Sequence, residues 1–227
     1  MTSNLDNHKF KYSLIPYIGA AIIGVSIIPF AYTTVKSFIS LSNYIQSSND
    51  LRASGNYKAA LDALNTAIKL DSKNPQLYID RADVRDKLGD EQGALQDCNK
   101  AIGLDPKSSL AYNNRATIRS KLGDKQGALQ DSNIVIKLAP ESGGAYNNRG
   151  LARRYLGDTE GALQDYNKAI QLNPEKAIAY SNRAVVRYEL GDKQGAIKDW
   201  QQAANLHLQQ GNTKKYLEVI EEIKLIQ

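Results

Sequence analysis

Apolar and polar positions recur along this chain with a fixed period of 34 residues. Each period contains two segments in which apolar side chains return every three or four positions, the spacing of one face of an α-helix. A tyrosine and a glycine mark every copy, at Tyr44, Tyr78, Tyr112, Tyr146 and Tyr180 and at Gly55, Gly89, Gly123, Gly157 and Gly191. A period of this length, held over five copies, predicts an all-α solenoid of helix-turn-helix units.

Turn residues separate the two helices of each unit. In the third copy we expect the first helix over about 109–122 and the second over about 125–138. Between them, Gly123 can adopt the left-handed conformation that ends a helix, and Asp124 can accept hydrogen bonds from the free N–H groups of the next helix. The same glycine-aspartate pair recurs in three other copies, and Gly55-Asn56 replaces it in the first.

A further glycine stands inside each of the last four second helices, at Gly93, Gly127, Gly161 and Gly195. Glycine in a helix interior costs about 1 kcal/mol relative to alanine. We expect a close approach between neighbouring helices to compensate. The equivalent positions Cys98, Tyr166 and Trp200 are predicted to lie in the core.

An uncharged apolar stretch, residues 12–35, precedes the repeats. As a helix it would be about 36 Å long, enough to cross a hydrocarbon core of about 30 Å. We therefore expect a single transmembrane helix that anchors the chain in a membrane, with a cleaved signal peptide and a buried core helix as the alternatives. The lysines just before it favour a cytoplasmic N-terminus, which would put the repeats in a periplasm or lumen.

The chain is thus expected to consist of four parts. They are a short tail (1–11), the transmembrane helix (12–35), the solenoid (40–210) and a C-terminal capping helix (211–227). The five repeats are expected at about 41–74, 75–108, 109–142, 143–176 and 177–210. The last helix should turn Tyr216, Leu217, Ile220, Ile223 and Ile226 inward and so cover the open end that a solenoid leaves, with a dimerisation or docking helix as the alternative.

Small residues recur at two further positions of every copy. One set is Ser48, Ala82, Ala116, Gly150 and Ala184, and the other is Ala60, Ala94, Ala128, Ala162 and Ala196. With the periodic tyrosine, this pattern over about residues 41–208 resembles the tetratricopeptide repeat (TPR) family, in a bacterial form. The resemblance implies a right-handed superhelix in which the first helices line a concave groove for protein partners. The layout is also similar to that of assembly factors of photosynthetic membrane complexes.

The resemblance places twelve residues in that groove. They are Ile79, Asp83 and Asp86; Asn113, Thr117 and Ser120; Asn147, Leu151 and Arg154; and Ser181, Val185 and Tyr188. Because arginine and tyrosine are enriched at interface hot spots, we expect the C-terminal half of the groove, which contains Arg154 and Tyr188, to supply most of the binding energy. Asp83 and Asp86 are expected to select basic residues of the partner.

Two arginines in each of copies two to five depart from the common form of the family. They are Arg81 and Arg85, Arg115 and Arg119, Arg149 and Arg153, and Arg183 and Arg187. An aspartate recurs on the second helices, at Asp97, Asp131, Asp165 and Asp199. One interpretation is an internal ladder of arginine–aspartate pairs that joins neighbouring helices, and the other is a rail that binds anions.

Composition narrows the functional classes. After residue 36 the chain has 26 basic and 23 acidic residues, a net charge of +3, and the two signs are mixed. This is not the basic stripe of a nucleic-acid-binding protein. His8 and His207 lie at opposite ends of the chain, and Cys98 is the one cysteine. With no catalytic or phosphate-binding motif, we expect no enzyme, cofactor, metal or small-molecule substrate.

The sequence therefore predicts a membrane-anchored adaptor that binds protein partners in its groove and helps a membrane protein complex to assemble or remain stable. The membrane contact is assigned to residues 12–35. The alternative is a permanent structural subunit of a membrane complex, such as a photosynthetic one.

Overall fold

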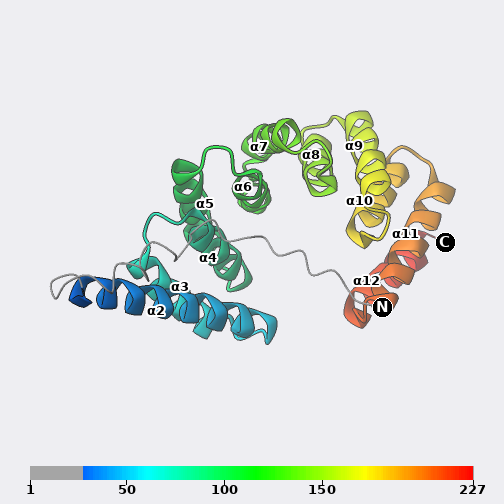
Figure 1. Cartoon of the computed structure of the whole chain (residues 1–227). Helices are drawn as coiled ribbons and strands as arrows, with labels where there is room; N and C mark the ends of the chain where they lie inside the picture. The colour runs from blue at the N-terminus through cyan, green and yellow to red at the C-terminus, as the bar shows by residue number, and fades with distance from the viewer. Residues whose placement is uncertain (1–27, 227) are drawn as a thin grey trace, which may run out of the picture.

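A computed structural model describes residues 28–226, with side chains from residue 37 onward. All the regular structure in this range is helical, and the helices follow one another around an open arc (Figure 1). Their bounds are α2 (Ile28–Ala53), α3 (Tyr57–Leu70), α4 (Pro75–Lys87), α5 (Glu91–Leu104), α6 (Ser109–Lys121), α7 (Lys125–Leu138), α8 (Gly143–Tyr155), α9 (Thr159–Leu172), α10 (Ala177–Glu189), α11 (Lys193–Gln209) and α12 (Thr213–Ile226). The all-α, repetitive solenoid predicted from the period is confirmed.

The turns between paired helices use the predicted chemistry. Gly123 has φ +86°, a conformation that favours glycine, and it lies between α6 and α7. The carboxylate of Asp124 then accepts a hydrogen bond from the backbone N–H of Gly127 at 2.8 Å, which caps α7. In each of the other repeats, the glycine that follows the first helix also has a positive φ.

The glycines inside the second helices have a different cause from the expected one. A Cβ built on Gly127 would lie 2.0 Å from an oxygen of Asp124. The capping carboxylate of the same helix therefore takes the space that a side chain would need. The same contact is present at Gly93, Gly161 and Gly195, so a contact within the helix accounts for the glycine at all four positions.

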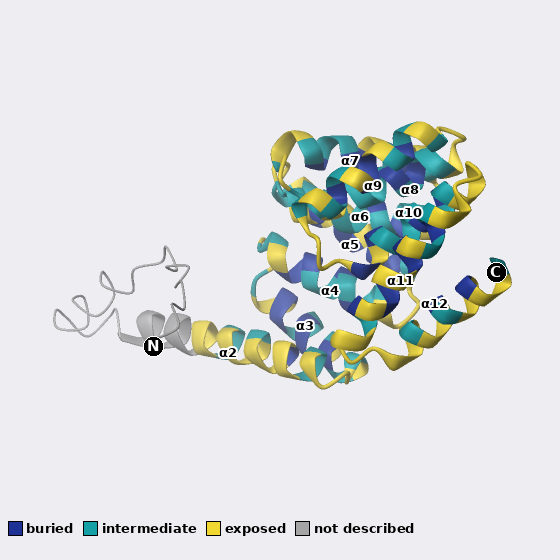
Figure 2. Ribbon diagram, turned by 90° about the vertical axis from the view of Figure 1, so that its right-hand side faces the viewer, coloured by how far each residue is buried: buried dark blue, intermediate teal, exposed yellow. Residues whose placement is uncertain are grey.

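The core lies between the paired helices and is built mostly from alanine, as the buried positions in Figure 2 show. The larger buried side chains fill the spaces between successive pairs. Cys98 and Tyr166 are 0% exposed and Trp200 is 4% exposed, which confirms their predicted place in the core.

Helix α12 packs against α11 and closes the C-terminal end of the arc. Val219 and Ile223 are its buried side chains, whereas Leu217 is 55% exposed. The prediction that Leu217 faces inward is wrong, because Val219 is buried on the inward face instead. The apolar face of the helix is therefore narrower at its start than the pattern predicts.

Single-pass membrane localisation is contradicted. No helix in the range 28–226 combines the length and the apolar character needed to cross a bilayer. Residues 12–27 of the predicted transmembrane helix lie outside the described residues, and 28–35 form the first turns of α2. The rest of α2 carries charged residues such as Asp50 and Arg52 and packs against α3.

Candidate functional site: the concave groove

The first helices of successive repeats line the inner side of the arc. Helix α4 contacts α6, α6 contacts α8 and α8 contacts α10, while α7 and α9 lie on the outer side (Figure 1). Nine of the twelve predicted groove residues border hollows in this concave surface. They are Asp83, Asp86, Asn113, Thr117, Ser120, Asn147, Leu151, Ser181 and Val185.

Three of these hollows are large enough to accept side chains of a partner. The central hollow, about 360 Å³, is lined by residues that include Asn113, Thr117, Gly144, Asn147, Asn148 and Lys176. The lysine hollow, about 250 Å³, is lined by Thr117, Ser120, Lys121, Lys125, Asn148, Leu151 and Tyr155. The terminal hollow, about 240 Å³, is lined by α10, α11 and α12 and includes Ser181, Val185, Trp200 and His207.

Asparagine side chains connect the first helices across the groove. The Asn148 amide donates to Asn113 Oδ1 and to Thr117 Oγ1, both at 3.1 Å. The Asn182 amide donates to Asn147 Oδ1 at 2.9 Å. Each contact uses only part of what an amide offers, because an asparagine has two N–H donors and two acceptor lone pairs. The central hollow therefore presents unused donors and acceptors to a ligand.

The groove charges predicted to meet a partner are instead paired with oppositely charged residues of neighbouring repeats. Arg52 Nη2 is 2.9 Å from a carboxylate oxygen of Asp83, and Lys121 Nζ is 2.6 Å from one of Asp86. Arg154 makes a two-pronged contact with Glu189, with its Nε 3.0 Å from each oxygen, and this hydrogen bonding raises the Arg154 pKa. The partners are 31 or 35 residues apart, so each pair joins two different repeats and the pattern within one repeat does not predict it.

The three remaining predicted residues, Ile79, Arg154 and Tyr188, do not line these hollows. Ile79 is 4% exposed and packs in the core of the first repeats, so its predicted place in the groove is wrong. The same apolar cluster includes Leu41 and Ile45 of α2. Tyr188 is partly exposed and its ring lies 6.3 Å from that of Trp200, while Arg154 is held by Glu189.

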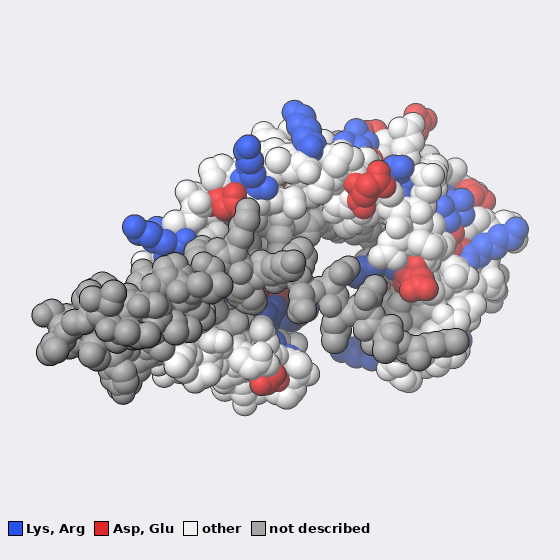
Figure 3. All heavy atoms as spheres, in the orientation of Figure 1, with Lys and Arg blue, Asp and Glu red and all other residues white. Residues whose placement is uncertain are grey.

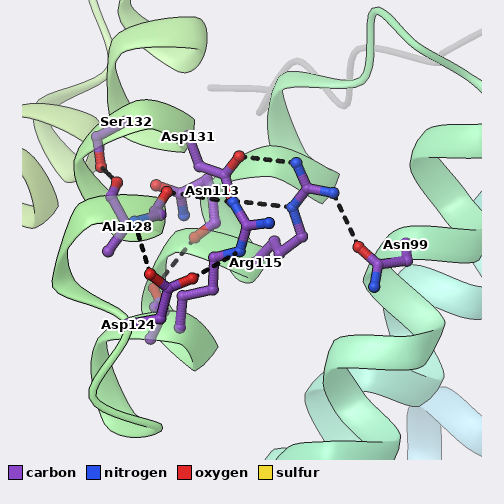
Figure 4. Close-up of polar contacts among 10 residues, drawn as sticks. Asn99, Asn113, Arg115, Asp124, Ala128, Asp131 and Ser132 are labelled. Carbon is purple, nitrogen blue, oxygen red and sulfur yellow. Dashed lines mark hydrogen bonds and ion pairs between the residues drawn. The ribbon is translucent and has the colours of Figure 1, made fainter.

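The arginine rows form an internal ladder, which confirms the first of the two interpretations. Arg115 Nε and Nη2 donate to the two oxygens of Asp131 at 2.9 and 2.8 Å, and Nη1 donates to Asn99 of the preceding repeat at 2.8 Å (Figure 4). Arg119 adds a contact of 2.8 Å to Asp131, whose side chain is 1% exposed. Hydrogen bonding to Asp131 raises the Arg115 pKa.

This arrangement repeats in copies two, four and five. Arg81, Arg149 and Arg183 each bind an aspartate of their own repeat and an asparagine of the one before. With those donors already engaged, the arginines join each repeat to its neighbour. They do not form an open rail for anions.

Cys98 and His207 are titratable groups outside the arginine ladder whose pKa values are shifted. Burial raises the pKa of the Cys98 thiol to about 12, so it stays protonated near neutral pH. Burial and the nearby Lys215 ammonium lower the pKa of His207. Within residues 28–226 there is no group of three histidine, cysteine, aspartate or glutamate side chains that could hold a metal ion. On the face in Figure 3, basic and acidic residues are interspersed along the upper edge of the arc.

Family models match three stretches of the chain. A model described as TPR repeat matches residues 49–89 and 150–191, and one described as tetratricopeptide repeat matches residues 75–108. The chain therefore carries tetratricopeptide repeats. No curated protein matches it.

Solved structures share the fold at low sequence identity. TTC0263, a thermophilic TPR protein of Thermus thermophilus, is 20% identical with a TM-score of 0.69, covering 79% of this chain and 98% of that one. MamA of Desulfovibrio magneticus is 22% identical with a TM-score of 0.64, covering 75% and 97%. YrrB, a TPR protein with an unusual peptide-binding site, is 20% identical with a TM-score of 0.56, covering 76% and 90%.

Proposed function

We propose that this protein is a scaffold, not an enzyme, and that it holds an extended segment of a protein partner in its concave groove. The observation that carries the proposal is the central hollow, where the side-chain amides of Asn113 on α6 and of Asn147 and Asn148 on α8 converge and keep hydrogen-bonding capacity for a ligand. A peptide backbone offers one donor and one acceptor per residue, so a row of amides is a suitable surface for it.

The arginine ladder supports the same proposal. Because each guanidinium joins two repeats, the first helices are held in fixed positions before any partner arrives. A surface that is already ordered avoids much of the entropic cost of binding. The chain would then act as an adaptor in the assembly or stabilisation of a multiprotein complex. The peptide-binding site of the structurally similar YrrB is in keeping with this role.

The proposal can be tested by filling the central hollow. Gly144 is an exposed residue of α8 that lines this hollow, and a Cβ built on it meets only Asn113 Oδ1, at 3.9 Å. Gly144→Phe should therefore occupy the hollow without disturbing the core. Gly103→Phe is the matched control, because Gly103 is an exposed helical glycine with nothing within 4 Å of an added Cβ and borders none of the three hollows.

Random dodecapeptides displayed on phage would be selected on the full-length chain, and the selected peptides measured by fluorescence anisotropy. We expect Gly144→Phe to weaken binding at least about tenfold, the loss of about 1.4 kcal/mol, and Gly103→Phe to leave it unchanged. Peptides that bind both variants equally would place the binding surface elsewhere. A selection that yields no binding peptide would also contradict the proposal.

A further inference from the structure

The central hollow and the lysine hollow are neighbours in the groove, since both are lined by Thr117 and Asn148. Together they form a track along α6, α8 and the start of α10. The charged side chains that line this track are Lys121, Lys125 and Lys176. Within the described residues, no aspartate or glutamate lines either hollow.

The three lysines differ in how far their charge is already compensated. Lys121 is paired with Asp86 at 2.6 Å. Lys125 has no such partner in the described part of the chain: its ammonium donates to the backbone carbonyl of Ser120 at 2.6 Å and lies 4.2 Å from the centre of the Tyr155 ring. These contacts fix the ammonium in place and leave its charge unneutralised.

Other groups in the lysine hollow suit an anion. The Ser120 hydroxyl and the Tyr155 phenol can both donate hydrogen bonds, and Leu151 provides an apolar wall. The nearby Arg154 is neutralised by Glu189, so it neither adds to nor opposes the field there. A carboxylate entering this hollow would meet one uncompensated ammonium and several hydrogen-bond donors.

Lys176 supplies a second charge at the far end of the track. It stands at the N-cap of α10, where it makes no side-chain capping bond, whereas Ser108 and Ser142 cap α6 and α8 at the equivalent positions. A lysine at a helix N-terminus is unfavourable for the helix, because the macrodipole is positive there. Its ammonium therefore adds to the positive potential over the central hollow.

We propose that the groove selects an acidic partner segment, with one carboxylate side chain in the lysine hollow near Lys125 and another over the central hollow near Lys176. This rests on the proposed peptide-binding function and specifies its partner chemistry. It also reverses the preference expected from Asp83 and Asp86, because both of those carboxylates are already paired.

The decisive variant is Lys125→Glu. Glutamate occupies the equivalent position 91 of the second repeat, where it is the first residue of α5, so the fold accepts it there. Lys193→Glu is the matched control: Lys193 is the first residue of α11 in the fifth repeat, it lines none of the three hollows, and its replacement changes the net charge equally. Lys176→Ser tests the second site and also restores a helix cap.

The probes are the dodecapeptides selected on the wild-type chain, labelled with fluorescein. We expect them to be enriched in aspartate and glutamate, to bind Lys125→Glu about five- to tenfold more weakly, and to bind Lys193→Glu within about twofold of wild type. Lys176→Ser should weaken binding about threefold while raising the melting temperature. A second selection on Lys125→Glu should lose the acidic preference.

The outcomes separate this inference from the proposed function. Peptides that lose binding in Gly144→Phe but show no acidic enrichment and no response to Lys125→Glu would overturn the acidic preference and leave the groove function intact. A selection without groove-binding peptides would overturn both. A labelled oligothymidylate that binds more tightly than the peptides, in a Lys125-dependent way, would overturn the acidic preference by showing that the track recognises nucleic acid instead.

Discussion

Replacing Arg115 by alanine should destabilise the solenoid more than replacing Arg119 or Arg154. The substitution removes two hydrogen bonds to the buried Asp131 and one to Asn99 of the preceding repeat. Removing one partner of a buried ion pair costs about 3–5 kcal/mol. Because Arg119 still contacts Asp131 at 2.8 Å, we expect the lower end of that range, about 3 kcal/mol.

Two further substitutions show whether the loss of stability is largest at Arg115, as the ladder predicts. Arg119→Ala removes one contact to Asp131 and a bond to the Gly127 carbonyl, so about 1–2 kcal/mol should be lost. Arg154→Ala is the control outside the ladder, because its pair with Glu189 is more exposed and should contribute less than about 1 kcal/mol.

Urea unfolding followed by far-UV circular dichroism would measure these differences, and amide hydrogen exchange in α6 and α7 would show where each variant opens. Repeats can unfold separately, so local exchange is the more direct readout. The groove peptides should bind folded Arg115→Ala as they bind wild type. A loss below about 1 kcal/mol for Arg115→Ala, or a larger loss for Arg119→Ala, would refute a structural ladder anchored at the first arginine.

Two other predictions concern the core. Gly150→Ala would place a Cβ 2.9 Å from the buried Tyr166 ring and should lower the free energy of unfolding by about 1–3 kcal/mol. Gly103→Ala, with open space around the added Cβ, should raise it by about 1 kcal/mol. Thermal melts would measure both, and equal effects would contradict the prediction. The Cys98 thiol, buried and with its pKa raised to about 12, should resist iodoacetamide at pH 8 in the native protein and react in urea. Because the raised pKa favours the protonated thiol, stability should also fall above about pH 9 unless Cys98 is replaced by serine.

Local residue chemistry was sufficient to predict the helices and their ends. The periodic tyrosine and alanine positions define two amphipathic helices per copy, and Gly123 with Asp124 specifies the turn between them. Those effects act within a few residues of the chain, so they can be read from sequence. The capping carboxylate over Gly127 is equally local, but it requires knowing that the Asp124 side chain lies above that glycine.

The groove depended on contacts between repeats, which the sequence pattern does not display. Asp83 and Arg154 are polar residues at groove positions, yet the structure neutralises both with partners 31 and 35 residues away. Ile79 belongs to the same pattern and is buried in the core of the first repeats.

The sequence by itself thus determined the repeat, its helices and the presence of an arginine–aspartate pattern. Only the tertiary structure decided which charges remain for a partner. The reason is that each of the groove ion pairs forms between neighbouring first helices, and their relative position is set by the stacking of whole repeats. Arg52, Lys121 and Arg154 each pair with a carboxylate, whereas Lys125 has no acidic partner among the described residues.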